Sequence, residues 1–226
     1  MRNAIRLDST TILTIDNSGC IGEKDADYVQ VPNEIVAYFA TRVALLEQWC
    51  AGAEPSHLVL ANFTGETAWA DYVRGCQRQF EEIGKDLPPI VGSTESNFSA
   101  LQSGLSLTMI GKRKFTPTIV NCHYFVIGRP LVGQQVMEHR QDVANLCELY
   151  TLLQADVIKA LWPCGSKGIG VEITAFTGQR FDCTVDMKSS AGPATAILVA
   201  VEETNIEQLY QAISAPIYRL EKIEAF

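Results

Sequence analysis

The sequence predicts an α+β fold arranged as two domains, and three observations support this prediction. Short apolar stretches with strand-like spacing alternate with two long amphipathic stretches in the first half of the chain. The length of 226 residues suits two small domains or one large domain. Charged residues and a proline interrupt the apolar pattern over residues 111–117. We therefore expect one domain over residues 1–114 and a second over residues 115–226.

The first domain is predicted to be a mixed α+β unit. Its strands are expected at residues 4–7, 11–16, 57–63, from 90 onward and 104–111. Two amphipathic helices are expected at residues 35–51 and 67–83, each followed by a glycine. The buried face of the second helix is predicted to consist of Trp69, Tyr72, Val73, Cys76 and Phe80.

The second domain is predicted to combine strands and helices with two loops of small residues. Its strands are expected at residues 118–127, 194–201 and 217–223, and its helices at residues 134–149, 152–161 and 203–213. The two loops are Pro163–Gly170 and Lys188–Pro193.

One carboxylate on the long first helix is out of place. The strand before this helix is predicted to end at Asp16, followed by a loop over Asn17–Lys24. At 100° per residue, Glu47 falls on the apolar face of the helix, where an unpaired charge is costly. Two interpretations stay open. Glu47 forms a buried ion pair, or it belongs to a metal or phosphate site in which Asp16 is the second ligand.

The composition argues against several classes of protein. A net charge of −8 and a pI of about 4.9 argue against a nucleic-acid partner. No apolar stretch approaches the roughly 18 residues that span a membrane, and the first residues lack the apolar core of a signal peptide. The seven cysteines contain no C-x-x-C motif, which indicates reduced thiols. We therefore expect a cytoplasmic protein.

Common nucleotide and acyl-transfer motifs are absent. The chain contains no G-x-x-x-x-G-K-[ST] and no G-x-S-x-G, and residues 165–170 do not form G-x-G-x-x-G. What remains is a set of spaced acids and loops of small residues. This combination suits a metal-held polyphosphate better than acyl chemistry.

Several stretches together form a recognisable set. The most specific is the end of the long helix, Gly52-Ala53-Glu54-Pro55, before an apolar strand. The strand before Asp16, the segment Val91–Glu95, the loop Gly165–Gly170 and the segment Ala215–Leu220 agree with it. These stretches resemble the AIR synthase superfamily, which includes thiamine-monophosphate kinase, selenophosphate synthetase and HypE. Residues 16–19 and 188–195 are most similar to short AIR-synthase-related proteins such as α-ribazole kinases.

The resemblance implies a PurM-like fold of two α+β domains. The first domain would pair with a second copy of the chain to build a closed β-barrel, and the second domain would be a shortened form. ATP and Mg²⁺ would bind at the interface of this homodimer. The substrate would be a small molecule.

The resemblance also implies the site residues. Asp16, Glu47 and Glu95 would hold Mg²⁺ on the ATP phosphates, with Thr94 as an alternative alignment for Glu95. Backbone N–H groups around Ser18–Gly22 would line the phosphates, and Lys24 would neutralise charge. The full set of predicted cofactor-binding residues is Asp16, Asn17, Ser18, Gly19, Gly22, Lys24, Glu47, Gly92, Ser93, Thr94 and Glu95.

The acceptor is expected to lie against the two loops of the second domain, with Lys167 or Lys188 facing the transferred phosphoryl group. The alternative for each lysine is an ordinary surface charge. The implied function is an ATP- and Mg²⁺-dependent phosphotransferase that acts on a nucleoside-like substrate such as α-ribazole. Two alternatives are an ATP-dependent ligase or cyclase of the AIR synthase type and a non-catalytic nucleotide-binding dimer.

Overall fold

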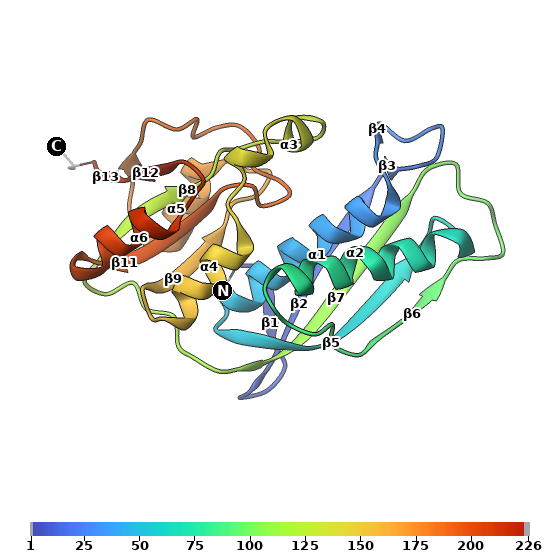
Figure 1. The fold of residues 1–226 in the computed structure, drawn as a ribbon, viewed down its shortest axis with the longest axis horizontal. Coiled ribbons are helices and arrows are strands. Elements are labelled where there is room, and N and C mark those ends of the chain that lie inside the picture. The colour runs from blue at the N-terminus through green and yellow to red at the C-terminus, as the bar shows by residue number, and fades with distance from the viewer. Residues whose placement is uncertain (1, 224–226) are drawn as a thin grey trace. The chain divides into compact units, whose positions relative to one another are not determined.

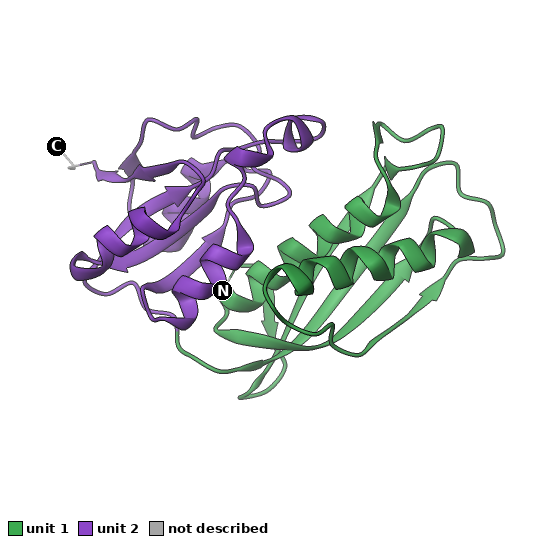
Figure 2. Cartoon of the chain, in the orientation of Figure 1, with its two compact units in different colours: residues 1–116 green, residues 117–226 purple. Residues whose placement is uncertain are grey.

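A computed structural model describes residues 2–223 of the chain (Figure 1). The chain divides into two compact units, unit 1 over residues 1–116 and unit 2 over residues 117–226 (Figure 2). The boundary predicted from the sequence lies between residues 114 and 115. Among the described residues, no helix is both long and apolar enough to cross a membrane.

Unit 1 is built on a five-stranded sheet in the order β1-β2-β7-β5-β6. The pairs are antiparallel except for β5 and β6, which run parallel. The sheet of a single chain is open, with β1 and β6 at its edges. Its strands are β1 (Ala4–Arg6), β2 (Thr11–Gly19), β5 (Ala53–Asn62), β6 (Ile90–Thr94) and β7 (Gly104–Arg113). A short parallel pair, β3 (Ile21–Gly22) and β4 (Val29–Gln30), lies in the connection between β2 and the first helix.

Two helices, α1 (Asn33–Cys50) and α2 (Trp69–Glu82), lie side by side over one face of this sheet (Figure 1). A short 3₁₀ turn, η1 (Glu66–Ala68), precedes α2. Alternate strand residues point toward the helices, and Ile12, Leu58, Leu60, Leu107 and Met109 are buried there. The predicted face of α2 is partly wrong. Gly75 and Gln79 are buried with Tyr72, Cys76 and Phe80, whereas Trp69 and Val73 are only half-buried.

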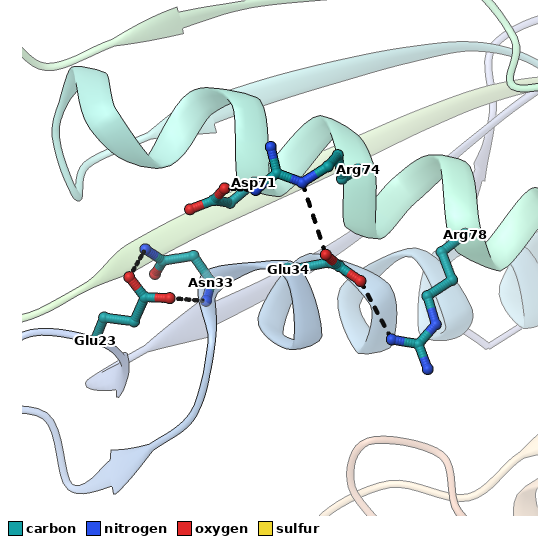
Figure 3. Close-up of polar contacts among 6 residues, drawn as sticks. All are labelled: Glu23, Asn33, Glu34, Asp71, Arg74 and Arg78. Atoms are coloured by element: carbon teal, nitrogen blue, oxygen red, sulfur yellow. Dashed lines mark hydrogen bonds and ion pairs between the residues drawn. The ribbon is translucent and has the colours of Figure 1, made fainter.

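Charged groups fix the start of α1 against its surroundings (Figure 3). The Glu23 carboxylate accepts hydrogen bonds from the backbone N–H of Asn33 at 3.0 Å and from its side chain at 3.2 Å. It therefore caps the positive end of the helix. The next residue, Glu34, pairs with Arg74 and Arg78 of α2. These exposed pairs contribute less than about 1 kcal/mol each, so they orient the helices more than they stabilise them.

The other face of the sheet carries exposed apolar side chains. One row across the strands contains Ile15, Thr108, Val59 and Val91, which the strand register places side by side. Val91 is 64% exposed and Ile15 is 48% exposed. We call this surface the open face. Several exposed apolar side chains on one face are typical of an interaction site.

Unit 2 contains a four-stranded antiparallel sheet in the order β12-β8-β11-β9. Its main strands are β8 (Cys122–Ile127), β9 (Ile158–Pro163), β11 (Ile197–Glu202) and β12 (Ile217–Arg219), and β10 (Phe181–Asp182) pairs with β13 (Glu221–Lys222). Its helices are α3 (Gln135–Glu138), α4 (Leu146–Gln154), α5 (Ile169–Thr177) and α6 (Ile206–Ala212), with 3₁₀ turns η2 (Arg140–Asp142) and η3 (Glu203–Asn205).

Helices cover both faces of the sheet in unit 2. On one face, Ile169 and Ile173 of α5 pack with Val126 and Leu198 in a buried cluster. On the other face, α4 packs against β9, and the ring of Tyr210 in α6 meets Phe125 edge-on. The sheet is therefore the centre of its own core, separate from that of unit 1.

Several predictions for unit 2 are corrected by the structure. The predicted helix over residues 152–161 is wrong, because α4 ends at Gln154 and residues 158–163 form β9 against β11. A short apolar run fits a helix or a strand equally well, and strand pairing decides between them. The predicted helix over residues 134–149 is broken, and α4 begins only after Asn145 caps it through the Glu148 N–H at 3.1 Å. The predicted loop at residues 163–170 is wrong at its end, where Ile169 begins the unexpected helix α5.

Candidate functional site

Asp16 lies within a strand and not at the end of one. The sequence predicted that the strand ends there, but β2 continues to Gly19, and residues 16–19 pair with residues 104–107 of β7. Asp16 is on the helix-facing side of the sheet, in the same alternation as the buried Ile12 and Thr14. Its carboxylate is therefore directed beneath α1.

Glu47 is completely buried in the C-terminal half of α1. Its Oε1 forms an ion pair with the guanidinium of Arg2, and its Oε2 accepts a hydrogen bond from the backbone N–H of Asn3 at 3.2 Å. The buried ion pair, the first of the two interpretations of Glu47, is thus present in the structure. Arg2 is itself largely buried, with 16% of its side chain exposed.

Asp16, Glu47 and Arg2 interact electrostatically. We call the two carboxylates, Asp16 and Glu47, the acid pair. Burial raises the pKa of Asp16 to about 7, with a further increase from the negative charge of Glu47. A hydrogen bond from the Asn17 backbone and the positive charge of Arg2 act in the opposite direction. Two carboxylates held this close beneath a helix cost free energy unless a cation neutralises them.

The raised pKa of Asp16 predicts a pH dependence of stability. Between about pH 4 and pH 7 the folded protein holds a proton at Asp16 that the unfolded chain releases, so stability falls as the pH rises through this range. We expect Asp16→Asn to remove this slope and to stabilise unit 1 at pH 8 by on the order of 2 kcal/mol, allowing for partial solvent screening. Thermal unfolding in metal-free buffer at pH 4.5 and pH 8 measures the difference. Asp25→Asn, at an exposed position of unit 1, is the control, and an equal slope in both variants would contradict the assignment.

Glu95 does not join the acid pair within one chain. The register places Asp16, Leu107, Leu60 and Gly92 in one row across the sheet, so β2 and β6 are separated by three strand spacings, or about 14 Å. Glu95 follows β6, and its carboxylate accepts the backbone N–H of Asn97 at 2.7 Å. Among residues 2–223, no group of three or more His, Cys, Asp or Glu side chains is arranged to hold a metal ion. The three-acid metal site remains a prediction.

The loop that was expected to line the phosphates is braced by its own hydrogen bonds. Cys20 N–H donates to the Ser103 carbonyl at 2.9 Å, and the Lys24 ammonium donates to the Ala100 carbonyl at 2.8 Å. Asp27 accepts from the Ser103 N–H at 2.7 Å and from the Lys24 N–H at 3.0 Å. Gly22 has φ +155°, and a Cβ there would meet the Ser103 hydroxyl at 2.4 Å, so only glycine fits. Asn17, Ser18 and Gly19, which were expected in the same loop, belong instead to β2.

The segment Gly92–Thr94 also has structural roles. Gly92 lies under the Trp69 ring, which would be 2.8 Å from an added Cβ. Ser93 is exposed, and the Thr94 hydroxyl accepts a hydrogen bond from the Asn62 side chain at 3.2 Å. These contacts account for Gly92 and Thr94 without a ligand, and the predicted binding role of residues 92–94 stays a prediction.

The two small-residue loops of unit 2 meet each other. Gly170 N–H donates to the Met187 carbonyl at 2.9 Å, and Ala191 N–H donates to the Gly165 carbonyl at 3.1 Å. Lys167 and Lys188 are exposed on these loops, one in each. Hydrogen bonds from Ser189 and from the Lys188 backbone lower the pKa of Asp186, which organises the second loop. The structure therefore brings together the two loops that carry the predicted catalytic lysines.

Arg2 was missed by sequence reasoning. It precedes the edge strand that was expected at residues 4–7, and no local motif marks it. The feature that places Arg2 near the acid pair is the strand register. With Ala4 opposite Thr14, continuing the antiparallel pairing by two residues puts Arg2 beside Asp16.

Comparisons with known proteins identify the fold. No family model matches the sequence, and no curated protein matches it. Among solved structures, a chain of the HypE–HypF complex matches with a TM-score of 0.60 at 17% identity, covering 98% of this chain and 87% of that one. Thiamine monophosphate kinase (ThiL) from Aquifex aeolicus matches with a TM-score of 0.61 at 13% identity, covering 98% and 89%. AaThiL complexed with AMPPCP and TMP gives 0.59 at 13% identity, covering 98% and 84%.

At these identities the likeness shows the fold alone. These neighbours are PurM-like members of the AIR synthase superfamily, so the predicted mixed α+β, PurM-like architecture is confirmed. The sheet of unit 1 is open in a single chain, so the closed barrel stays part of the dimer prediction.

Proposed function

We propose that this protein is an ATP- and Mg²⁺-dependent phosphotransferase that acts on a small nucleoside-like substrate, with α-ribazole as the first candidate. The observation that carries the proposal is the acid pair, Asp16 and Glu47, which interact electrostatically beneath α1, with Arg2 paired to Glu47. Mg²⁺ is usually held in proteins by one or two carboxylates together with substrate phosphates and water. Asp16 and Glu47 supply this number of carboxylates, and Arg2 occupies Glu47 in the structure.

The fold supports the choice of nucleotide. AMPPCP, with which AaThiL was crystallised, is an ATP analogue, and ThiL is named as a kinase. The likeness covers nearly the whole of the present chain. An ATP-dependent phosphotransferase is therefore the simplest activity that combines this fold with a buried acid pair.

Each part of the chain would have a separate role in the transfer. Asp16 and Glu47 would hold Mg²⁺, which when bound neutralises charge on the phosphates. Lys167 and Lys188 would donate hydrogen bonds to oxygens of the transferred phosphoryl group, and the loops that carry them would bind the acceptor. Phosphoryl transfer depends mainly on positioning and charge stabilisation. No general base is assigned.

A homodimer is part of the proposal. The open face of unit 1 carries Ile15, Val59 and Val91 in one row, with Ile5 near the edge, and all four side chains are exposed in the single chain. Pairing two such faces would bury these side chains and close the sheet into a barrel.

One experiment tests the proposal in two steps. Thermal unfolding is measured with and without Mg-ATP, and the mass in solution is measured by sedimentation. We expect a dimer with a magnesium-dependent rise in melting temperature, because a ligand at ~100 times its Kd stabilises the folded state by ~2.7 kcal/mol. ADP release is then followed with α-ribazole and a panel of nucleosides. Release that depends on one nucleoside supports the kinase, whereas absence of both binding and release would overturn the proposal.

A non-catalytic nucleotide-binding dimer is the second candidate. It is favoured by the ion pair between Arg2 and Glu47, since an arginine already neutralises the most buried acid. Nucleotide binding without turnover across the whole substrate panel would support this candidate over the kinase.

A further inference from the structure

Glu47 cannot accept a metal ion in the arrangement that the structure shows. Its side chain has no exposed surface, and both of its oxygens are engaged. Oε1 is paired with Arg2, and Oε2 accepts the Asn3 N–H. The backbone N–H of Arg2 also hydrogen-bonds the Cys50 thiol, one helical turn further on. Arg2 and Asn3 together thus cover the end of α1 that carries Glu47.

We propose that residues 2–6 form a displaceable strap whose Arg2 guanidinium holds the acid pair closed and must leave before Mg-ATP binds. This inference rests on the proposed function. In the closed state, Arg2 supplies the positive charge that the acids require. In the open state, Mg²⁺ on the nucleotide replaces it, and Glu47 becomes accessible.

The strap is held weakly enough to open without unfolding unit 1. β1 has three residues and lies at the edge of the sheet, paired only with β2. Ile5 is 59% exposed, and Arg6 is exposed beside it. Ala4 of the strap packs against the small cluster of Ile12, Ala51 and Ala53. Short edge segments open locally without global unfolding, and the cost of separating Arg2 from Glu47 would be offset when Mg²⁺ replaces it.

Competition between Arg2 and the metal has a measurable consequence. If most molecules hold the strap closed, the apparent affinity for Mg-ATP is reduced by the fraction that is open. Substituting Arg2 removes the ion pair with Glu47, which is the main interaction that holds the strap closed. We therefore expect Arg2→Ala to tighten Mg-ATP binding by about tenfold, within the range usual for coupling between two sites.

The test is calorimetric titration of the full-length chain with Mg-ATP. Wild type, Arg2→Ala and Arg6→Ala are compared, and Arg6 serves as the control because it is an exposed arginine of the same strand. Tighter binding by Arg2→Ala alone supports the strap. Equal or weaker binding by Arg2→Ala overturns it while leaving the proposed function intact. Absence of binding in all three proteins overturns the proposed function and the strap together.

A second measurement needs no variant, which matters because Arg2→Ala leaves Glu47 without its partner. Amide hydrogen exchange of the wild type is followed as Mg-ATP is added. We expect the protection of residues 3–6 to decrease while the protection of β7 increases. If residues 3–6 become more protected together with the rest of the sheet, the strap stays closed over the bound nucleotide and the inference is wrong.

Discussion

Replacing Glu47 by glutamine is expected to weaken Mg-ATP binding at least 100-fold and to abolish the nucleotide-dependent rise in melting temperature. The amide keeps the size of the side chain but loses the charge that a metal ion requires. The same change leaves the largely buried Arg2 beside a neutral group. Breaking a buried ion pair from one side costs about 3 kcal/mol, so the variant will also be less stable.

Two further variants separate the binding effect from the stability effect. In Arg2→Gln/Glu47→Gln, both charges are removed and the two amides can hydrogen-bond each other, so most of the lost stability should return. Binding should not return, because the metal ligand is still absent. Glu34→Gln is the matched control, since it changes the same residue type on the same helix at a half-buried, ion-paired position. Its affinity should equal that of the wild type.

The measurement is calorimetric titration at a temperature where each variant is folded. A folded Glu47→Gln protein that binds Mg-ATP with wild-type affinity would remove Glu47 from the site. In that case the ion pair with Arg2 would be a structural feature of the helix, which was the first of the two interpretations open at the level of sequence.

The position of Glu47 illustrates what periodicity can predict. Helical spacing alone placed this carboxylate on the buried face of α1, and the structure confirms that it is fully buried. Its partner could not be predicted in the same way. Arg2 is 45 positions away in the sequence, and only the pairing of β1 with β2 brings it to Glu47. Local patterns specify faces, whereas long-range partners depend on strand register.

The end of the strand at Asp16 was predicted wrongly for a related reason. Asn17, Ser18 and Gly19 are turn-forming residues, which favoured a loop. In the folded chain each of them is opposite a residue of β7, and the hydrogen bonds of that ladder outweigh the local preference. Asp16 is consequently fixed by its pairing with β7 and is not carried on a flexible loop.

The sequence could not predict how far apart in the sheet the residues of the predicted site lie. The resemblance to the AIR synthase superfamily implied that Asp16 and Glu95 belong to one cluster. The strand order inserts β7 and β5 between the strands that carry them. Amphipathic alternation predicts which face a residue occupies, but many strand orders satisfy the same alternation.

The second large effect is expected at the contact between α1 and α2. Gly75 is buried at this contact, and a Cβ there would lie 2.1 Å from the Glu34 carbonyl oxygen and 2.8 Å from the Tyr38 nitrogen. Both atoms belong to the helix backbone, so no side-chain rotation relieves the overlap. Gly75→Ala would therefore force the two helices apart over the sheet.

Two opposing contributions to the free energy of unfolding decide whether Gly75→Ala stabilises or destabilises unit 1. Alanine favours the helical conformation by about 1 kcal/mol relative to glycine. Overpacking at a tight contact costs about 1–3 kcal/mol and more when backbone must move. The overlap with two backbone atoms puts Gly75 at the upper end, so we expect a net destabilisation of unit 1 by about 2 kcal/mol.

Hydrogen exchange of the α1 and α2 amides is the appropriate measurement, because a chain of two units need not unfold in a single step. A loss of 2 kcal/mol corresponds to exchange about 30 times faster in these helices, with little change in the sheet of unit 2. Gly19→Ala is the control, since a Cβ there has nothing within 4 Å. If Gly75→Ala instead slowed exchange, helix propensity would outweigh the clash, and the two helices would have to be further apart than their backbone contact at Gly75 implies.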